Sequence, residues 1–310
     1  MNHSLSRRQL LAGSAATAVA CSTSSVPVAS ATGIKPLFSY CLNTSTIREQ
    51  GLPIDQEIKL AAKVGYHGVE PWIRELVAYK ESGGKLSDLK KLIADSGMTV
   101  DSAIGFARWV VNDDAERKKG FEDAKRDMDL VAQIGGTRIA APPMGMHKAG
   151  ELDLLKAAER YRDLIELGEE FGVVPMVETW GSARNMSRLG EAVFIAIESG
   201  HPNACMLPDV YHMYRGGSDH GALHLLSAEA IPVCHVNDYP DMPREEMKDA
   251  DRVYPGDGVA PVAEILKLLG RPGSKTALSL ELFNRDYWKQ DAEKVLATGL
   301  AKMKAAVTQV

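Results

Sequence analysis

Eight short apolar segments, each followed by a stretch with helical periodicity, most strongly limit how this chain of 310 residues can fold. The eight predicted strands cover residues 36–42, 68–72, 99–104, 137–141, 173–179, 204–209, 232–237 and 277–282. Strands that alternate with helices pair in parallel through right-handed crossovers, and eight such strands close a barrel. A doubly wound sheet is less favoured because no Gly-x-Gly-x-x-Gly follows the first strand. We therefore predict an α/β protein with a single (β/α)8 TIM-barrel domain over residues 32–310.

Glycine, proline and serine residues mark the ends of the predicted helices. Pro53 begins a helix that Gly65 ends, and Ser87 caps a helix that ends before Gly97. Further helices are predicted over residues 115–134, 157–171, 187–199, 220–228, 259–269 and 291–307. The long connection over residues 238–258 is expected to carry function, because the loops that follow barrel strands usually do.

Residues 1–31 differ in composition from the rest of the chain. Arg7 and Arg8 are their only basic residues apart from histidine, and they contain no acidic residue. The sequence Ser6-Arg7-Arg8-Gln9-Leu10-Leu11 resembles the twin-arginine export motif, and the Ala-rich stretch behind it is too short to span a bilayer stably. We predict a twin-arginine-type signal peptide over residues 1–31 and a periplasmic location for the mature protein.

The four cysteines lead to two different predictions. Cys21 follows Ala18-Val19-Ala20, which fits both a cleavage site and a degenerate lipoprotein box, so a lipid anchor on Cys21 stays open. Membrane association is expected only with that anchor. The other three cysteines lie singly in predicted strands without metal-ligand spacing, and we interpret them as buried apolar thiols: Cys41, Cys205 and Cys234.

The charge balance bears on the choice of partner. Lys and Arg number 36 against 41 Asp and Glu, which gives a formal net charge of -5. A chain with this balance has no overall attraction for a phosphate backbone. Nucleic acid is therefore not an expected partner, and a small molecule is.

Four consecutive predicted strands, the fifth to the eighth, each end in a side chain that can bind a metal ion. These residues are Glu178, Asp209, His235 and Glu281. The carboxyl ends of all strands meet at one mouth of a barrel, so these side chains are expected to converge. Three converging carboxylates repel one another without a cation, and such ligands suit Mn²⁺, Co²⁺, Mg²⁺ or Zn²⁺. We predict one divalent metal ion there, with Mn²⁺ as the first choice.

The spacing of these residues resembles that of the xylose isomerase-like barrel superfamily of sugar isomerases and epimerases. The matching positions are Glu178, Asp209-x-x-His212, His235, Arg252 ahead of Pro255-Gly256-Asp257-Gly258, and Glu281. The resemblance implies that the four strand-end residues bind the metal, and that Glu178 and Glu281 also act as acid and base on opposite faces of the substrate. It also implies that His212 and Arg252 contact substrate oxygens.

Other side chains near strand ends are candidates for substrate contact. Glu70 ends the second strand, at a position that is often acidic in this family, and a structural hydrogen-bonding role is the alternative. His147 follows the fourth strand and either contacts substrate or lies in solvent. Aromatic faces beyond the third and fifth strands are candidates for stacking on a sugar ring, with ordinary packing as the alternative: Phe106, Trp109 and Trp180.

This set of residues predicts proton transfer beside a ketone. A carboxylate removes the proton, and a metal chelated by the carbonyl and a neighbouring hydroxyl stabilises the enediolate. Proton return to the same carbon from the opposite face gives an epimerase, and return to the neighbouring carbon gives an isomerase. We predict a metal-dependent isomerase or epimerase acting on a keto-sugar or keto-sugar derivative. A dehydratase or lyase acting on a keto-inositol or 3-keto-glycoside is the alternative, and a non-catalytic periplasmic sugar-binding protein is less favoured.

One position departs from the family pattern. Ketohexose 3-epimerases of this family tend to have a second acidic residue shortly after the strand-five glutamate, whereas this chain has Arg184. The basic side chain disfavours a free ketohexose as substrate and favours an oxidised sugar, a keto-glycoside or a keto-inositol. The sequence leaves the oligomeric state open, with a homo-oligomer among the alternatives.

Overall fold

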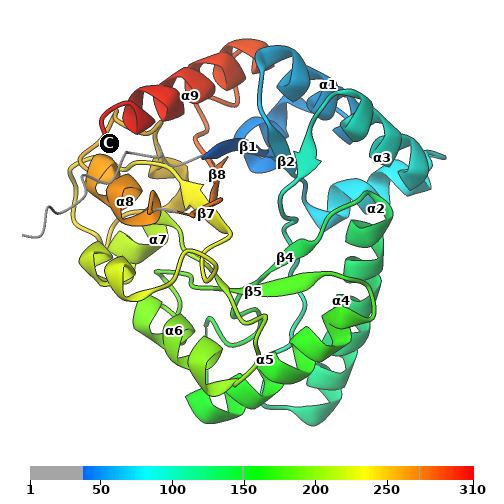
Figure 1. Cartoon of the computed structure of the whole chain (residues 1–310), viewed down its shortest axis with the longest axis vertical. Coiled ribbons are helices and arrows are strands. Elements are labelled where there is room, and N and C mark those ends of the chain that lie inside the picture. Colours follow the sequence, from blue (N-terminus) through cyan, green and yellow to red (C-terminus); the bar gives the residue numbers. More distant parts are fainter. Residues whose placement is uncertain (1–37, 149, 272) are drawn as a thin grey trace, which may run out of the picture. The chain divides into compact units, whose positions relative to one another are not determined.

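The computed structural model describes residues 38–148, 150–271 and 273–310, so the predicted signal peptide over residues 1–31 lies outside the described part. Within that part, parallel strands form an inner ring that helices surround (Figure 1). The strands are β1 Ser39–Asn43, β2 Gly68–Glu70, β3 Thr99–Val100, β4 Arg138–Ala141, β5 Val174–Glu178, β6 Met206–Leu207, β7 Val233–Val236 and β8 Ala277–Leu280. This arrangement confirms the predicted TIM-barrel fold.

The strands hydrogen-bond in the order of the chain around the ring. They form a five-stranded sheet, β3-β2-β1-β8-β7, and a three-stranded sheet, β4-β5-β6. At one junction between the sheets the Ala140 amide donates to the Ala103 carbonyl oxygen at 2.8 Å. At the other junction Asp209 and His235 form a parallel bridge. The second junction therefore places two predicted metal ligands beside each other.

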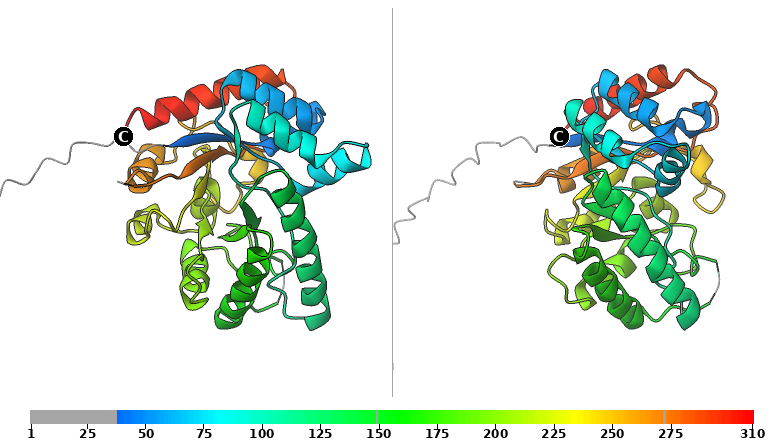
Figure 2. Two further views of the ribbon diagram at one scale, coloured as in Figure 1. Left: turned by 45° about the vertical axis from the view of Figure 1, so that its right-hand side comes forward. Right: turned by 90° about the vertical axis from the view of Figure 1, so that its right-hand side faces the viewer.

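The helices lie outside the strands, as the side views show (Figure 2). They are α1 Ile54–Val64, α2 Ile73–Glu81, α3 Leu86–Asp95, α4 Asp114–Gln133, α5 Leu154–Glu169, α6 Leu189–Glu198, α7 Val210–Arg215, α8 Val262–Leu269 and α9 Ala292–Val307. Short 3-10 segments are η1 Thr44–Gln50, η2 His220–Leu225 and η3 Asp249–Asp251. As predicted, α1 begins after Pro53 and ends at Gly65, whose φ of 100° lets its N–H donate to the Ala61 and Ala62 carbonyls.

Several helices differ from the sequence prediction. The sequence pattern does not predict α2, whose first turn is stabilised by Glu75 accepting a hydrogen bond from the Trp72 amide at 2.9 Å. It also does not predict α7, because six residues are too few to show helical periodicity. Ser87 lies inside α3 and does not cap it. The α8 helix starts later than predicted because Pro261 occupies its N-cap, and only η2 forms over the predicted helix at residues 220–228.

Two apolar clusters hold the barrel together. A large cluster lies between strands and helices, and a smaller one fills the ring: Cys41, Trp72, Ile104, Ala140, Met176, Cys205, Leu207, Val233 and Ala277. Fully burying a large apolar side chain is worth about 1.5–3 kcal/mol, so the inner cluster stabilises the strands that carry the site. The three predicted apolar thiols are buried and free, which confirms their interpretation.

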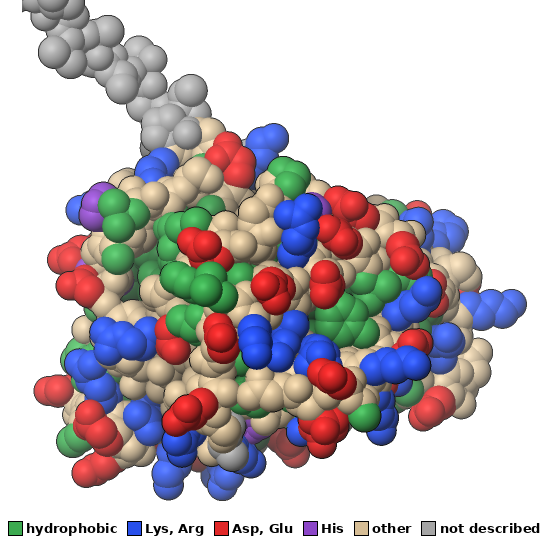
Figure 3. All heavy atoms as spheres, turned by 90° about the horizontal axis from the view of Figure 1, so that it is seen from below, with side chains coloured by type: hydrophobic (Ala, Val, Ile, Leu, Met, Phe, Trp, Pro, Cys, Tyr) green, Lys and Arg blue, Asp and Glu red, His purple; other side chains and the backbone are tan. Residues whose placement is uncertain are grey.

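The surface carries charges of both signs. On the face shown in Figure 3, Lys and Arg side chains lie among Asp and Glu side chains, without one continuous basic patch. An exposed pair such as Arg162–Glu166, at 2.9 Å, contributes no more than about 1 kcal/mol. Among the described residues, none of the helices has the length and apolar character needed to cross a membrane.

One buried carboxyl group on α1 makes folding stability depend on pH. Glu57 is 2% exposed, and its Oε2 has no hydrogen-bond partner in the described part of the chain. Burial and the nearby Glu75 raise the pKa of Glu57 to about 9, while Arg48 and Arg74 lower it. The pKa in the unfolded chain is about 4.3. The stabilising effect of protonated Glu57 is therefore complete below about pH 4 and is lost as the pH rises through about 9.

Glu57→Gln is expected to raise the free energy of unfolding at pH 8 by more than about 1 kcal/mol, because the amide keeps the shape of the neutral carboxyl without its ionisation. Urea unfolding at pH 5, 7 and 9 measures this effect, which should grow with pH. Glu49→Gln, on an exposed neighbouring side chain, is the control and should leave the profile unchanged. Parallel pH profiles for wild type and Glu57→Gln would contradict the assignment.

Candidate active site

A pocket of roughly 280 Å³ opens at the carboxyl ends of the strands. Its lining residues are Trp72, Ile104, Phe106, Glu178, Trp180, Ser182, His212, Asp249, Arg252, Glu281 and Phe283. Glu178 is the last residue of β5 and Glu281 directly follows β8. Both carboxylates therefore enter the pocket from strand ends, as the sequence predicts.

Three of the predicted metal ligands form one compact group. The ligand atoms of Asp209, His235 and Glu281 lie within 4.8 Å of one another, and all three side chains are buried. His235 Nδ1 is 3.2 Å from Glu281 Oε2 and 3.6 Å from Asp209 Oδ2, yet it makes no hydrogen bond in the described part of the chain. A buried nitrogen facing two carboxylate oxygens fits the ligand set of a divalent cation.

Glu70 supports this group from behind instead of lining the pocket. It is fully buried, and its Oε2 lies 3.0 Å from His235 Nε2. The same oxygen accepts hydrogen bonds from Ser279 Oγ at 2.7 Å and Asn43 Nδ2 at 2.9 Å. A carboxylate on one ring nitrogen orients the other nitrogen toward a metal. Glu70 does not line the pocket, and these contacts favour the structural hydrogen-bonding alternative, in which Glu70 is placed to orient His235.

The charge state of His235 follows from its neighbours. Burial lowers the pKa of the imidazole, but the Glu281 and Glu70 carboxylates raise it well above its ordinary value. In the absence of a metal, a proton on Nδ1 therefore balances part of the carboxylate charge. A metal ion held by this nitrogen would have to replace that proton, and metal affinity at such sites rises with pH.

Arg252 reaches the middle of the site from the β7–α8 loop and is 1% exposed. Its Nη1 donates to Glu281 Oε2 at 2.6 Å and to Asp209 Oδ2 at 3.0 Å, and its Nη2 donates to Asp249 Oδ1 at 2.9 Å. Burial lowers the pKa of Arg252, but these carboxylates raise it above the usual value. The guanidinium therefore stays charged and neutralises carboxylates that would otherwise be buried without a cation.

His212 lies beside Arg252 on the short helix α7. Asp209 Oδ1 accepts the His212 backbone N–H at 2.8 Å and so caps this helix. His212 Nδ1 accepts the Gly181 amide N–H at 3.1 Å, so the neutral ring carries its proton on Nε2. That Nε2 lies 3.1 Å from Arg252 Nη2. Because a protonated Nε2 cannot accept the Arg252 N–H, this contact is not a hydrogen bond in that tautomer; both side chains line the pocket.

Glu178 faces the same pocket and is 4% exposed. Burial raises the pKa of its carboxyl to about 8, with His235 lowering it and the Glu281 and Asp209 carboxylates raising it. A carboxyl group with this pKa can hold or release a proton near neutral pH. Glu178 is not part of the compact group of three ligands, so its role as a fourth ligand stays a prediction.

Four aromatic rings form one wall of the pocket. Trp72 lies 5.0 Å from Phe106 and 6.0 Å from Phe283, and Phe106 lies 6.2 Å from Trp180, measured between ring centres. Trp180 and Phe106 were predicted from the sequence, whereas Trp72 and Phe283 were not. A repeated spacing in the sequence could have revealed Trp72 and Phe283. At the ends of β2, β5 and β8, an aromatic residue stands two positions after a glutamate: Glu70 and Trp72, Glu178 and Trp180, Glu281 and Phe283.

Two predicted substrate contacts lie away from the pocket lining. Trp109 is 0% exposed, and its Nε1 donates to the Pro142 carbonyl oxygen at 2.9 Å. Its predicted stacking on a sugar is therefore corrected, since Trp109 belongs to the core. His147 packs edge-on against Trp180 with ring centres 5.2 Å apart. His147 does not line the pocket but packs against Trp180, which does.

Asp238 organises the loop that carries Arg252, and the sequence did not single it out. Its buried carboxylate accepts four backbone N–H groups, at 2.8–3.1 Å, from Tyr239, Gly256, Gly258 and Ala260. A Cβ atom on Gly258 would collide with the Tyr239 carbonyl oxygen and with Asp238, so the loop ends meet only with glycine there. Both ends of the loop that carries Arg252 are therefore held at one point.

The chain belongs to the xylose isomerase-like TIM barrel family, because the family model of that description matches residues 58–306. The inosose isomerase of Bacillus velezensis is 23% identical over 272 residues, which cover 87% of this chain and 97% of that protein. The 3-dehydroshikimate dehydratase of Pseudomonas putida is 22% identical over 81% of this chain and 39% of that longer protein.

Solved structures share the fold. The crystal structure of the IOLI protein with a bound zinc atom has a TM-score of 0.80 and 22% identity, covering 88% of this chain and 99% of that one. The 3-keto-D-glucoside 4-epimerase YcjR of E. coli has a TM-score of 0.68 and 17% identity, covering 87% and 100%. These similarities establish the barrel, while the chemistry has to be argued from the pocket.

Proposed function

We propose that this protein is a divalent-metal-dependent isomerase or epimerase that moves a proton beside the ketone of a polyhydroxylated substrate. The observation that carries the proposal is the unpartnered His235 Nδ1, buried against the Asp209 and Glu281 carboxylates next to the pocket. Relatives named as an inosose isomerase and a keto-glucoside epimerase support the reaction class.

Asp209, His235 and Glu281 would hold the metal, with Glu178 proposed as a fourth ligand. When bound, a divalent ion supplies a Lewis acid that stabilises negative charge developing on a substrate oxygen. Oxygen-rich donors with one imidazole suit Mn²⁺ as the first choice, and Zn²⁺, Co²⁺ and Mg²⁺ remain alternatives. The zinc atom in the IOLI structure supports a divalent ion in this fold.

The side chains around the pocket are proposed to transfer the proton and to position the substrate. Glu178, from β5, and Glu281, after β8, are proposed as the acid and base that take a proton from carbon and return it. His212 and Arg252 both line the pocket and are proposed to contact substrate oxygens, which fixes the ring between the two carboxyl groups. The aromatic wall covers the apolar face of the ring and keeps water from the carbanion-like centre.

The proposed substrate class is a keto-inositol or a keto-glycoside. Arg184 is exposed near the fifth strand, where ketohexose epimerases tend to have an acid, and the inosose isomerase relative acts on a keto-cyclitol by name. A dehydratase is the second candidate, because two relatives are named 3-dehydroshikimate dehydratases. Elimination of a β-hydroxyl group starts with the same proton removal, so the product distinguishes the two reactions.

Solvent deuterium exchange tests the proposal. The metal-loaded protein is incubated in D₂O with a keto-inositol, a 3-keto-glucoside and a ketohexose, and mass spectrometry follows deuterium gain and loss of water. We expect exchange with one of the first two substrates and its loss after chelation. Water loss would favour the dehydratase. No exchange with any substrate in the presence of Mn²⁺, Zn²⁺, Co²⁺ or Mg²⁺ would refute the proposed chemistry.

A further inference from the structure

A second cavity, of roughly 500 Å³, lies at the opposite end of the barrel from the active site. Its lining includes the first residues of four strands: Ser39 of β1, Arg138 of β4, Val233 of β7 and Ala277 of β8. Parallel strands begin at one end of a barrel and finish at the other, so this cavity is separate from the pocket at Glu178 and Glu281. The proposed reaction leaves this end of the barrel unused.

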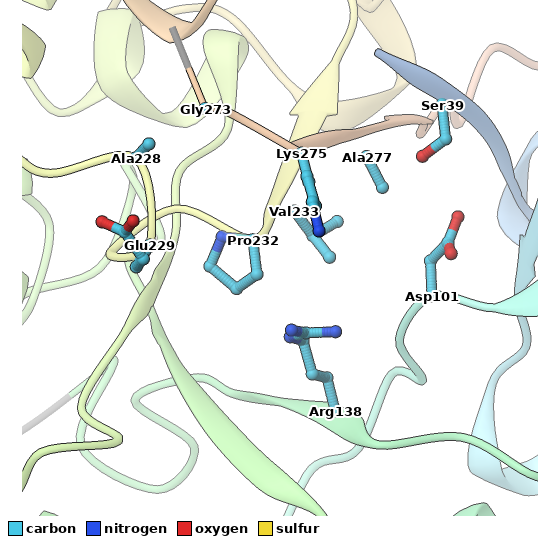
Figure 4. A pocket seen from close by; sticks show the side chains of 10 residues that line it. All are labelled: Ser39, Asp101, Arg138, Ala228, Glu229, Pro232, Val233, Gly273, Lys275 and Ala277. Atoms are coloured by element: carbon cyan, nitrogen blue, oxygen red, sulfur yellow. The ribbon is translucent and has the colours of Figure 1, made fainter. Parts of the chain in front are cut away.

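Two cationic side chains from distant parts of the sequence point into this cavity. Arg138 and Lys275 converge there from different segments, as Figure 4 shows. Arg138 makes a single long hydrogen bond in the described part of the chain, from Nη1 to Thr137 Oγ1 at 3.4 Å. Arg138 is half-buried and Lys275 is exposed, and neither forms an ion pair with a described residue, so their N–H groups remain available to an anion.

The other side of the cavity presents an acceptor. Asp101 Oδ1 accepts a hydrogen bond from Thr99 Oγ1 at 2.8 Å, while its buried Oδ2 has no partner among the described residues. This carboxylate fits only because position 68 is glycine, where a Cβ atom would collide with Asp101 Oδ2. Ser39 lies on the same side of the cavity as Asp101, and the exposed Glu229 lies across from them (Figure 4).

We propose that this cavity binds a small hydroxylated carboxylate, with its carboxylate between Arg138 and Lys275 and a hydroxyl group donating to the Asp101 carboxylate. Two unpaired cations favour a negative group on one side. The Asp101 carboxylate favours a hydroxyl donor on the other side and repels a second negative charge. This combination selects a hydroxy acid over a dianion such as phosphate, whose remaining charge would face Asp101.

Isothermal titration of the metal-loaded full chain with D-glycerate, acetate, glycerol and inorganic phosphate tests the proposal. We expect saturable glycerate binding and at least about fivefold weaker acetate and phosphate binding. Arg138→Gln and Lys275→Gln should each weaken glycerate binding by about tenfold. Asp101→Asn should reduce the preference for glycerate over acetate. Lys267→Gln, an exposed lysine on α8, is the matched control and should bind as wild type does.

Three outcomes would overturn the proposal. The first is unchanged glycerate affinity in both Arg138→Gln and Lys275→Gln, and the second is no saturable binding in the wild type. The third is glycerate binding that disappears in Glu281→Gln and persists in Arg138→Gln, because that pattern assigns the ligand to the proposed metal site at the opposite mouth.

Discussion

Turnover is expected to fall about a thousandfold or more when Glu281 is replaced by glutamine, because the amide cannot accept a proton from carbon. The loss of charge also removes one of the three grouped ligands, so metal affinity should fall together with turnover. Glu178→Gln should cause a comparable loss of turnover, while the Asp209, His235 and Glu281 group remains intact. Deuterium exchange and metal content, measured on the same samples, check both statements.

The matched control for these variants is Glu198→Gln, which makes the same change on an exposed position of α6 and should keep turnover within twofold. Circular dichroism and unfolding curves establish that each variant retains the barrel. Full exchange activity in both Glu178→Gln and Glu281→Gln would rule out the proposed acid and base.

Arg252→Gln is expected to destabilise the metal-free protein by about 3 kcal/mol, since it leaves the buried Asp209 and Glu281 carboxylates without their guanidinium partner. For a chain of this size that corresponds to a lower Tm by roughly 5–10 °C. The proposed divalent metal would bind the same two carboxylates, so saturating Mn²⁺ should recover much of the loss. Thermal unfolding with and without metal measures both effects.

Arg162→Gln provides the comparison, because Arg162 pairs with Glu166 at 2.9 Å on the surface where both side chains are half exposed. Its expected effect is below about 1 kcal/mol, with no dependence on metal. If Arg252→Gln were no less stable than Arg162→Gln in metal-free buffer, the central role assigned to Arg252 would be wrong.

The sequence predicts the barrel because strand and helix periodicities alternate eight times. This alternation remains recognisable even where the predicted start or end of a single helix or strand is wrong by a few residues. The same geometry explains why Glu178, Asp209, His235 and Glu281 could be located in advance. Parallel strands bring their carboxyl ends to one mouth of the barrel, so side chains at or just beyond those ends can gather there. Helix α7 escaped prediction because its cap, Asp209, also serves the site and its length gives no periodic signal.

Contacts that depend on strand register could not be predicted from a single sequence. Glu70 meets His235 because β2, β1, β8 and β7 are neighbours in the ring, with Ser279 aligned to both Cys41 and His235. Trp109 illustrates the opposite error, since a position just after a strand does not reveal whether the ring turns toward the mouth or the core. The hydrogen bond that turns Trp109 toward the core goes to the Pro142 carbonyl oxygen, 33 residues further along the chain.

The single carboxylate of Asp238, which fastens Tyr239, Gly256, Gly258 and Ala260, has a consequence for how such barrels diversify. Asp238 fixes both the point where the β7–α8 loop leaves β7 and the point where it returns toward α8. Segments of other lengths can be exchanged there only if Asp238, the closing glycines and Arg252 are kept, because Arg252 pairs with Asp209 and Glu281. Substrate preference is therefore expected to change through the residues of this loop that do not contact the strand-end carboxylates.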